Sequence, residues 1–165
     1  MQPNQTLDSA AMIRRATPAD ASSIFRVHIS SIRGISEGHY SEAQINGWCA
    51  DRRPESYLRP IAEQFMAVAE VFGEVAGFAQ LSIPDATIEA VYVHPRHSRQ
   101  GIGMRLMNAL ETAARSADLP ALRLQASLNA VPFYKAAGYV PGSVGHHAVA
   151  GGVTIACIAM FRSLE

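Results

Sequence analysis

Residues 88–107 form a strand, a short loop and a glycine-opened helix, and this segment sets the strongest limits on the fold. Thr87–Val93 has the pattern of a strand, and Gly101–Ala117 repeats apolar residues at three- and four-residue steps, which predicts an amphipathic helix. The first N–H groups of a helix lack partners inside it, and the helix dipole adds positive potential there. Glycines let a phosphate approach this backbone closely. The segment therefore predicts a site for a phosphate-bearing ligand.

Two other nucleotide-binding motifs do not fit this segment. It lacks the Gly-Lys-Ser/Thr of a P-loop and the third glycine of a dinucleotide fingerprint. The strand also comes late in the chain, unlike the start of a Rossmann unit. A Gly-X-Gly by itself is also compatible with a turn that packs a helix against a strand. Arg96, Arg99 and Arg105 supply positive charge that favours the phosphate interpretation.

The rest of the chain predicts an α/β (α+β) domain with a mixed, mostly antiparallel sheet of about six or seven strands and about four helices. A meander of three strands precedes Gly101, and a strand–helix–strand unit follows, which implies one parallel pair. Gly73-Glu74 is predicted to be a two-residue type II′ turn. Helices are expected at 18–31, from 41, at 54–62, 101–117 and 129–137, and strands at 11–15, 65–72, 75–83, 87–93, 121–126, 139–149 and 153–162.

Composition narrows the class of protein. The length of 165 residues suits one domain, residues 11–165, after a flexible tail, residues 1–10. Fourteen basic residues balance fourteen acidic ones, so we expect no nucleic-acid partner. We see neither a signal peptide nor a membrane-spanning run, and we expect a cytoplasmic protein. Cys49 and Cys157 are expected to be buried thiols. His94 and His97 have no third ligand near by, so no metal site is predicted.

Two correctly spaced motifs resemble the GNAT superfamily of N-acetyltransferases, and the resemblance covers about residues 12–163. The first is Val91–Pro95 followed by Arg99-Gln100-Gly101-Ile102-Gly103, which is similar to the family's Gln/Arg-X-X-Gly-X-Gly/Ala. The second is Ser127–Tyr139, which is similar to the family's later helix with its tyrosine. A weaker likeness at His39–Trp48 is to a subgroup of bacterial members.

The resemblance implies that acetyl-CoA lies between two splayed parallel strands, at about 87–94 and 121–126. Ser98 stands where the family has glutamine or arginine, so the backbone would carry the pyrophosphate contacts. The pantetheine arm would pair with the backbone near Tyr92 and contact either Ser127 or Asn129. The implied cofactor-binding residues are Tyr92, Val93, Ser98, Arg99, Gln100, Gly101, Ile102, Gly103, Met104, Ser127 and Asn129.

The implied chemistry is direct attack of an amine on the thioester. An alkyl ammonium must first lose a proton, and Glu89 is our candidate general base, acting through water. A backbone N–H near Val93 would stabilise the oxyanion. Tyr134 lies where the family has its acid tyrosine, so we expect it to donate to the leaving thiolate. The candidate residues for binding the acceptor are His28, Tyr40, Trp48 and His147.

The favoured function is thus an acetyl-CoA-dependent N-acetyltransferase for the primary amine of a small molecule. Two alternatives remain at this point: a protein or peptide N-acetyltransferase, and a non-catalytic acyl-CoA-binding sensor. A homodimer through the last strands is expected from the resemblance.

Overall fold

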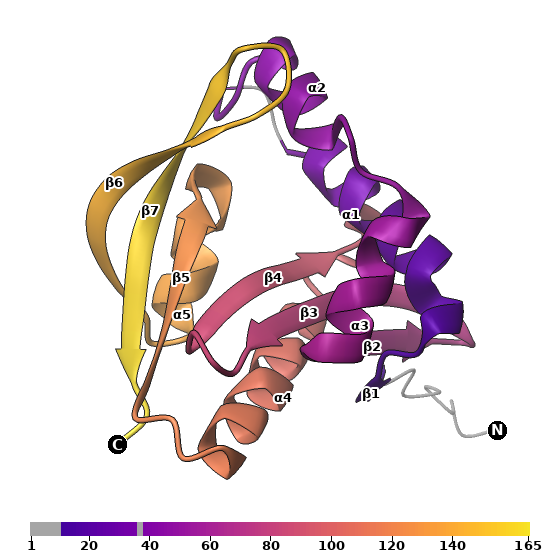
Figure 1. Ribbon diagram of the computed structural model, residues 1–165, viewed down its shortest axis with the longest axis vertical. Coiled ribbons are helices and arrows are strands. Elements are labelled where there is room, and N and C mark those ends of the chain that lie inside the picture. Colours follow the sequence, from indigo (N-terminus) through magenta and orange to yellow (C-terminus); the bar gives the residue numbers. More distant parts are fainter. Residues whose placement is uncertain (1–10, 36–37) are drawn as a thin grey trace, which may run out of the picture.

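The computed structural model describes residues 11–35 and 38–165, and the tail predicted for residues 1–10 lies outside them. Figure 1 shows one twisted sheet with helices on both faces. The strands are β1 (Met12–Arg15), β2 (Phe65–Val71), β3 (Glu74–Ser82), β4 (Thr87–Val93), β5 (Ala121–Ser127), β6 (Val140–Ala148) and β7 (Thr154–Ser163). The α-helices of the described part are α1 (Ala21–Arg33), α2 (Glu42–Cys49), α3 (Leu58–Glu63), α4 (Ile102–Ser116) and α5 (Val131–Ala136).

The sheet has seven strands in the order β1-β2-β3-β4-β5-β7-β6. Every neighbouring pair is antiparallel except β4 and β5, which are parallel and are joined by α4. The predicted mixed sheet with a single parallel pair is therefore confirmed. One half of the sheet is the meander β1–β4, and the other half is β5 with the long β6–β7 hairpin.

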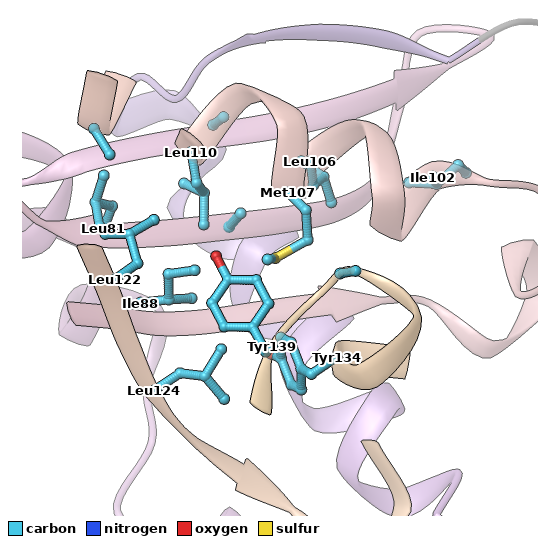
Figure 2. Close-up of a cluster of buried hydrophobic side chains, with 14 of the residues drawn as sticks. Leu81, Ile88, Ile102, Leu106, Met107, Leu110, Leu122, Leu124, Tyr134 and Tyr139 are labelled. Carbon is cyan, nitrogen blue, oxygen red and sulfur yellow. The ribbon is translucent and has the colours of Figure 1, made fainter. Parts of the chain in front are cut away.

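Two apolar layers cover the sheet. Helix α4 packs its buried residues, such as Leu106 and Leu110, on one face, where Leu81, Leu122 and Tyr134 join the same cluster (Figure 2). Helices α1 and α3 cover the opposite face of β2–β4 with a second cluster. Burial of this apolar surface is the main stabilising contribution to the fold. It also fixes helices α1, α3 and α4 relative to the parallel strands β4 and β5.

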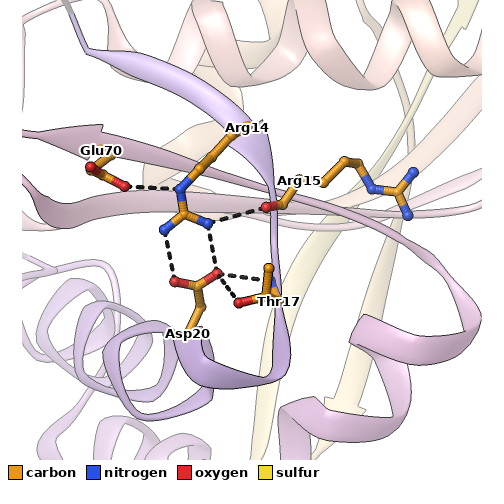
Figure 3. Close-up of polar contacts among 5 residues, drawn as sticks. All are labelled: Arg14, Arg15, Thr17, Asp20 and Glu70. Carbon is orange, nitrogen blue, oxygen red and sulfur yellow. Dashed lines mark hydrogen bonds and ion pairs between the residues drawn. The ribbon is translucent and has the colours of Figure 1, made fainter.

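A polar network fixes the start of α1. The Arg14 guanidinium on β1 donates to both carboxylate oxygens of Asp20 at 2.8 and 2.9 Å, and its Nε donates to Glu70 on β2 at 2.8 Å (Figure 3). The Asp20 carboxylate also accepts from the backbone N–H of Thr17 at 2.8 Å. This bidentate pair orients α1, which carries His28 and Ser31 to the functional region.

Three local predictions need correction. The hairpin turn is Phe72-Gly73, not Gly73-Glu74, because Val71 pairs with Glu74. Both turn residues have positive φ, 50° and 80°, which is the type I′ geometry that matches strand twist. The helices expected at 54–62 and 129–137 each begin with a 3-10 turn, so their α-helical parts, α3 and α5, are shorter than expected.

The last two strands carry the exposed apolar surface. Val140, Val144 and Phe161 are all more than half exposed on β6 and β7. These are the strands through which a homodimer is expected, and that expectation stays a prediction. Cys49 and Cys157 are free and buried, as predicted.

Candidate functional site

The parallel strands β4 and β5 separate soon after they meet. They pair only at Thr87 with Arg123 and at Ile88 with Leu124. The next residue, Glu89, is a β-bulge, because Leu81 of β3 pairs with Ile88 while Gln80 pairs with Ala90. A bulge bends its strand and strengthens the local twist, so β4 turns away from β5 at this point. Figure 1 shows the two strands diverging from their contact.

The split leaves backbone groups of β4 without a strand partner. The N–H of His94 donates to Ala76 of β3 at 2.8 Å, so the groups of its neighbour Val93 point the other way, toward the split. The carbonyl of Val93 accepts from the Ser31 hydroxyl of α1 at 2.7 Å. The Val93 N–H remains directed to the split, where an incoming ligand can pair with it.

A small cavity of about 190 Å³ lies in the split. It brings together the side chains that the sequence predicts for the acetyl donor and for chemistry, namely Glu89, Tyr92, Val93, Ser127, Asn129 and Tyr134. Ser127 and Asn129 both line it, so both candidates for the pantetheine contact remain in place.

A larger cavity of about 510 Å³ opens beside the first one. Four residues predicted for the acceptor line it: His28, Tyr40, Trp48 and His147. Glu89, Tyr92 and Ser127 line both cavities, so the two spaces meet at the bulge. A donor in one cavity and an acceptor in the other would therefore approach each other at Glu89.

Burial tunes the ionisable groups at this junction. The Glu89 side chain is partly exposed, and its partial burial raises the pKa of its carboxyl, which the nearby charge of Asp85 raises further. Burial also raises the pKa of Tyr134, which stays a protonated phenol, and raises that of Tyr92 to about 12. A carboxylate that is a stronger base than usual next to a protonated phenol suits proton removal on one side and hydrogen-bond donation on the other.

His28 is held neutral inside the wall of the larger cavity. Burial lowers its pKa to about 3, and the charge of Arg52 acts in the same direction. Its Nδ1 lies 2.8 Å from the Tyr57 hydroxyl, and its ring lies 4.2 Å from that of Tyr92. Its Nε2 is buried and has no partner within the described residues.

Tyr40 uses its hydroxyl for structure. It donates to the carbonyl of Ala156 on β7 at 2.6 Å and accepts from the N–H of Leu128 at 2.9 Å. Its ring packs edge-on against Trp48, with centroids 5.5 Å apart. The predicted acceptor contact can therefore involve the ring of Tyr40, while the hydroxyl ties the segment before α2 to the second half of the sheet.

The two glycines of the loop before α4 act differently. Gly101 precedes the helix with φ 77°, a left-handed conformation that disfavours other residues. Gly103 lies in the first turn, where an added Cβ would be 2.9 Å from Cε2 of Phe133. Gly103 thus serves the packing of α4 against α5. The side chain of Ile102 is buried in the core, so only its backbone can reach a ligand.

The start of α4 keeps its expected anion-binding features. The first helical bond runs from the N–H of Arg105 to the carbonyl of Gly101, which leaves the preceding N–H groups without helix partners. Ser98, Arg99 and Gln100 are exposed next to this end. Residues 98–104 line neither cavity, so they would meet a different part of the ligand from Glu89 and Tyr134.

Sequence reasoning missed several residues that line the larger cavity. Gln125 had a signal in the alternation of β5, because the apolar Leu124 and Ala126 face inward and Gln125 does not. Arg52 had none, since it lies in a connection whose path depends on packing, and Tyr57 had none beyond its place in the helix expected at 54–62. The missed residues with polar side chains are Arg52, Ser56, Tyr57, Gln80, Thr87, Gln125 and Cys157.

Comparisons with known proteins agree with this geometry. The family described as "Acetyltransferase (GNAT) domain" matches residues 37–156. The chain is 30% identical to a GCN5-related N-acetyltransferase from Rhodopseudomonas palustris, also designated a class-II aminotransferase. The alignment covers 94% of this chain and 97% of that one, with a TM-score of 0.87. Comparison with curated proteins gave no match.

Two further structures share the fold at lower identity. PaiA N-acetyltransferase from Thermoplasma acidophilum, in complex with coenzyme A, is 20% identical, with coverage of 93% and 99% and a TM-score of 0.72. YncA from Salmonella typhimurium, a putative acetyltransferase with its cofactor acetyl-CoA, is also 20% identical, with 95% coverage of both chains and a TM-score of 0.72. No helix of the described residues is long and apolar enough to cross a membrane.

Proposed function

The chain belongs to the GNAT acetyltransferase family, and from this premise we propose that it transfers the acetyl group of acetyl-CoA to the primary amine of a small molecule. One observation carries the proposal: a cavity in the β4–β5 split and a larger, separate cavity share Glu89 at their junction. A donor thioester and an acceptor amine need such an arrangement for direct transfer in a ternary complex.

We propose that acetyl-CoA binds with its pyrophosphate at the start of α4 and its acetyl end in the split. The free N–H groups at the helix start and the exposed Arg96, Arg99 and Arg105 suit the phosphates. The β4 backbone at Val93 and the polar groups of Ser127 and Asn129 suit the pantetheine amides. The coenzyme A and acetyl-CoA bound in the two Thermoplasma and Salmonella proteins support the same donor here.

Proton transfer would begin at Glu89. The acceptor reaches the site mainly as an ammonium ion, which must lose one proton before its nitrogen can attack. Glu89 accepts that proton through a water molecule, and its raised pKa makes it a better base than a solvated carboxylate. The nitrogen then bonds to the thioester carbon. The Val93 N–H, directed into the split, would stabilise the oxygen that becomes negative.

Tyr134 would assist the departure of the thiolate. As the C–S bond breaks, the nitrogen loses its second proton, so one proton goes to the thiol of CoA and one goes to solvent. Because the pKa of Tyr134 is raised well above that of a thiol, its contribution is a hydrogen bond to the developing thiolate rather than full proton transfer.

The walls of the larger cavity favour a small acceptor over a protein segment. Helix α2 closes against the β6–β7 hairpin, where the Gln44 side chain donates to the carbonyl of Thr154 at 2.8 Å. An added Cβ on Gly47 of α2 would be 2.8 Å from Cγ2 of Val149, so the two elements are in close contact. A volume of about 510 Å³ is within the range of small-molecule sites.

Thermal unfolding tests the donor. A ligand present at 100 times its dissociation constant and binding only the folded state adds roughly 2.7 kcal/mol of stability. We expect acetyl-CoA and CoA to raise the Tm, whereas ATP and NAD should leave it unchanged. If neither CoA species stabilises the protein, the proposal fails.

A tyrosine pair tests whether the protein catalyses transfer or only binds the donor. Tyr134→Phe should lower kcat by about 10- to 100-fold and spare acetyl-CoA binding, because it removes one hydrogen bond to a charged atom. Tyr139→Phe is the matched control, since Tyr139 lies beside Tyr134 and its hydroxyl donates to Glu111 outside both cavities. The control should lose stability and keep kcat. Tight acetyl-CoA binding without turnover of any amine would instead favour a sensor.

A further inference from the structure

The larger cavity has one basic and one acidic side chain among the described residues that line it. Arg52 is the only lysine or arginine there, and Glu89 is the only aspartate or glutamate. The two do not form an ion pair with each other. Arg52 does not line the smaller cavity, so its charge belongs to the acceptor side.

The backbone and α2 together position Arg52. Asp51, immediately before it, has φ 63°, a left-handed conformation that turns the chain sharply after α2. The Nε of Arg52 donates to the carbonyl of Trp48 at 3.1 Å, a carbonyl in the last turn of α2. A guanidinium bound to the C-terminal end of a helix is favourably placed in the helix dipole. Its position is therefore set by the fold.

The other end of the Arg52 guanidinium lacks a carboxylate. A guanidinium has five N–H donors in a planar fork; the Nε bond to Trp48 uses one, and the guanidinium also interacts with the Tyr57 side chain, which lowers the pKa of Tyr57. Within the described residues Arg14, Arg59 and Arg162 each pair with a carboxylate, and Arg52 pairs with none. The N–H groups of the fork that do not contact Trp48 or Tyr57 remain able to bind a planar or tetrahedral oxyanion.

The charge of Arg52 acts on the cavity wall. Burial lowers the pKa of His28 and raises those of Tyr57 and Tyr92, and in all three cases the charge of Arg52 lowers the pKa. These three side chains line the cavity from α1, from the 3-10 turn before α3 and from β4. The cavity therefore holds a positive potential at one place and a carboxylate at another.

We propose that the acceptor is an amine that also carries an acidic group, a carboxylate, phosphinate or phosphonate, and that Arg52 binds this group while the amine lies at Glu89. The inference rests on the proposed acetyl transfer and specifies its substrate class. An amine without an acidic group would bring a second positive charge into a cavity that already contains Arg52. An amino acid or an aminophosphonate matches both charges of the cavity.

The test uses matched acceptors and variants. Thiol release from acetyl-CoA is measured with the L-amino acids, with aminophosphinates and aminophosphonates, and with the neutral amide of each. We expect kcat/KM for the acidic acceptors to exceed that for their amides by roughly 10- to 100-fold, the range for a hydrogen-bonded charged group. The class of acceptor with the highest kcat/KM, carboxylates or phosphorus acids, identifies the acidic group.

Arg52→Gln should remove this preference by raising KM for the acidic acceptor, with a smaller effect on kcat. Arg52→Lys keeps the charge without the planar fork, so it should restore part of the preference. Arg53→Gln is the matched control, because Arg53 is exposed and outside the cavity lining, and it should behave as the wild type. Thermal unfolding with CoA checks that each variant is folded.

Direct binding provides a second measurement. Trp48 is the single tryptophan of the chain, lines the cavity and accepts the Arg52 bond, so its fluorescence reports on this place. With CoA saturating and ionic strength held constant with chloride, acetate and phosphate are titrated. We expect saturable quenching in the wild type that is lost in Arg52→Gln and kept in Arg53→Gln.

The outcomes separate this inference from the proposed function. If acetyl-CoA stabilises the protein and neutral amines are acetylated as well as or better than acidic ones, the acetyltransferase stands and the acidic acceptor is wrong. If Arg52→Gln keeps both the preference and the anion-dependent fluorescence, Arg52 is not the binding residue. If no amine is acetylated and no anion changes the fluorescence, the inference is also wrong, whatever the result with acetyl-CoA.

Discussion

Glu89 is itself the extra residue of the β-bulge in β4, and the bulge sets its position. Because Glu89 has no partner on β3, the strand bends there, leaves β5 and opens the split that both cavities share. The same residue carries the carboxylate whose pKa is raised by burial and by Asp85. The residue that forms the β-bulge and the residue proposed as general base are therefore the same, Glu89.

Glu89→Gln should separate activity from stability. Loss of the proposed general base should lower kcat by roughly 100-fold. A carboxyl whose folded pKa is raised stabilises the fold below its unfolded pKa and loses that contribution as pH rises through the folded value. At pH 7 the variant should therefore unfold at a Tm equal to or above that of the wild type. Calorimetry and thiol release on the same preparations check both expectations.

Asp85→Asn tests the pH dependence of kcat/KM while leaving Glu89 in place. Asp85 raises the pKa of Glu89 through its charge and accepts a hydrogen bond from Ser82 at 2.7 Å, outside the reaction path. Removing the charge should move the acid limb of kcat/KM to lower pH without lowering the plateau. An unmoved limb would contradict the assignment of that limb to Glu89.

His28 should make the fold sensitive to acid. Its folded pKa, about 3, is below the unfolded value near 6.5, so the unfolded chain binds more protons between these limits. Its stabilising contribution is complete above pH 6.5 and is lost as pH falls toward 3, by up to about 1.4 kcal/mol per pH unit. Denaturant unfolding of His28→Gln across this window should show a shallower slope than the wild type. His146→Gln, at an exposed site on β6, controls for loss of one imidazole.

At the scale of elements, the start of α4 combines two requirements within three residues. Gly101 supplies a left-handed turn with open space around it, and Gly103 supplies the close approach of α4 to Phe133 of α5. Between them, Ile102 anchors the helix in the core. The loop is thus both a packing turn, as the alternative interpretation of Gly-X-Gly has it, and an open helix end.

A rescue experiment distinguishes the two glycines. Gly101→Ala should destabilise the protein by about 1 kcal/mol through backbone strain. Gly103→Ala should destabilise it by contact with the Phe133 ring, which must move. Adding Phe133→Leu should recover part of the loss in Gly103→Ala and none in Gly101→Ala. Stability is measured by chemical unfolding. Equal recovery when Phe133→Leu is added to Gly101→Ala and to Gly103→Ala would contradict the separate roles of the two glycines.

At the scale of the whole molecule, the acceptor cavity depends on two distant segments of the chain meeting. Helix α2 comes between β1 and β2 in the chain, and the β6–β7 hairpin comes at its end, yet Figure 1 shows the hairpin extending to α2. The hydroxyl of Tyr40 and the side chain of Gln44 bond to β7 carbonyls across this contact. The cavity wall is therefore shared by both halves of the sheet.

Gly47→Ala should open this contact. The added Cβ would meet Val149 and the Ala150 carbonyl, so α2 must move away from the hairpin. We expect KM for the acceptor to rise roughly tenfold, because small displacements impair positioning, while the affinity for acetyl-CoA is unchanged. Ala43→Ser, at an exposed position of the same helix, is the control. Parallel loss of acetyl-CoA affinity would mean that α2 also supports the split.

The sequence by itself determined the order and type of the elements, the parallel pair and the group of residues that line the smaller cavity. These features follow from short stretches of sequence. The spacing of apolar residues predicts α4, Gly101 marks its start, and the motif at Ser127–Tyr139 covers the end of β5 and helix α5. Glu89, Tyr92, Val93, Ser127, Asn129 and Tyr134 are near one another because the strand–helix–strand unit itself brings β4, β5 and α5 together.

Only the tertiary structure decided the acceptor half and the bulge. Arg52 lies in the connection after α2, and its place depends on α2 packing against β6 and β7, about a hundred residues away. Tyr57 lies in the 3-10 turn before α3, and its contact with His28 of α1 forms only in the folded chain. The Tyr40 hydroxyl likewise donates to the carbonyl of Ala156 on β7, a contact that forms only when these distant segments pack together. The β2–β3 hairpin shows the same limit within one turn. Gly73 marked the turn in the sequence, but the strand register, with Val71 opposite Glu74, placed it at Phe72-Gly73.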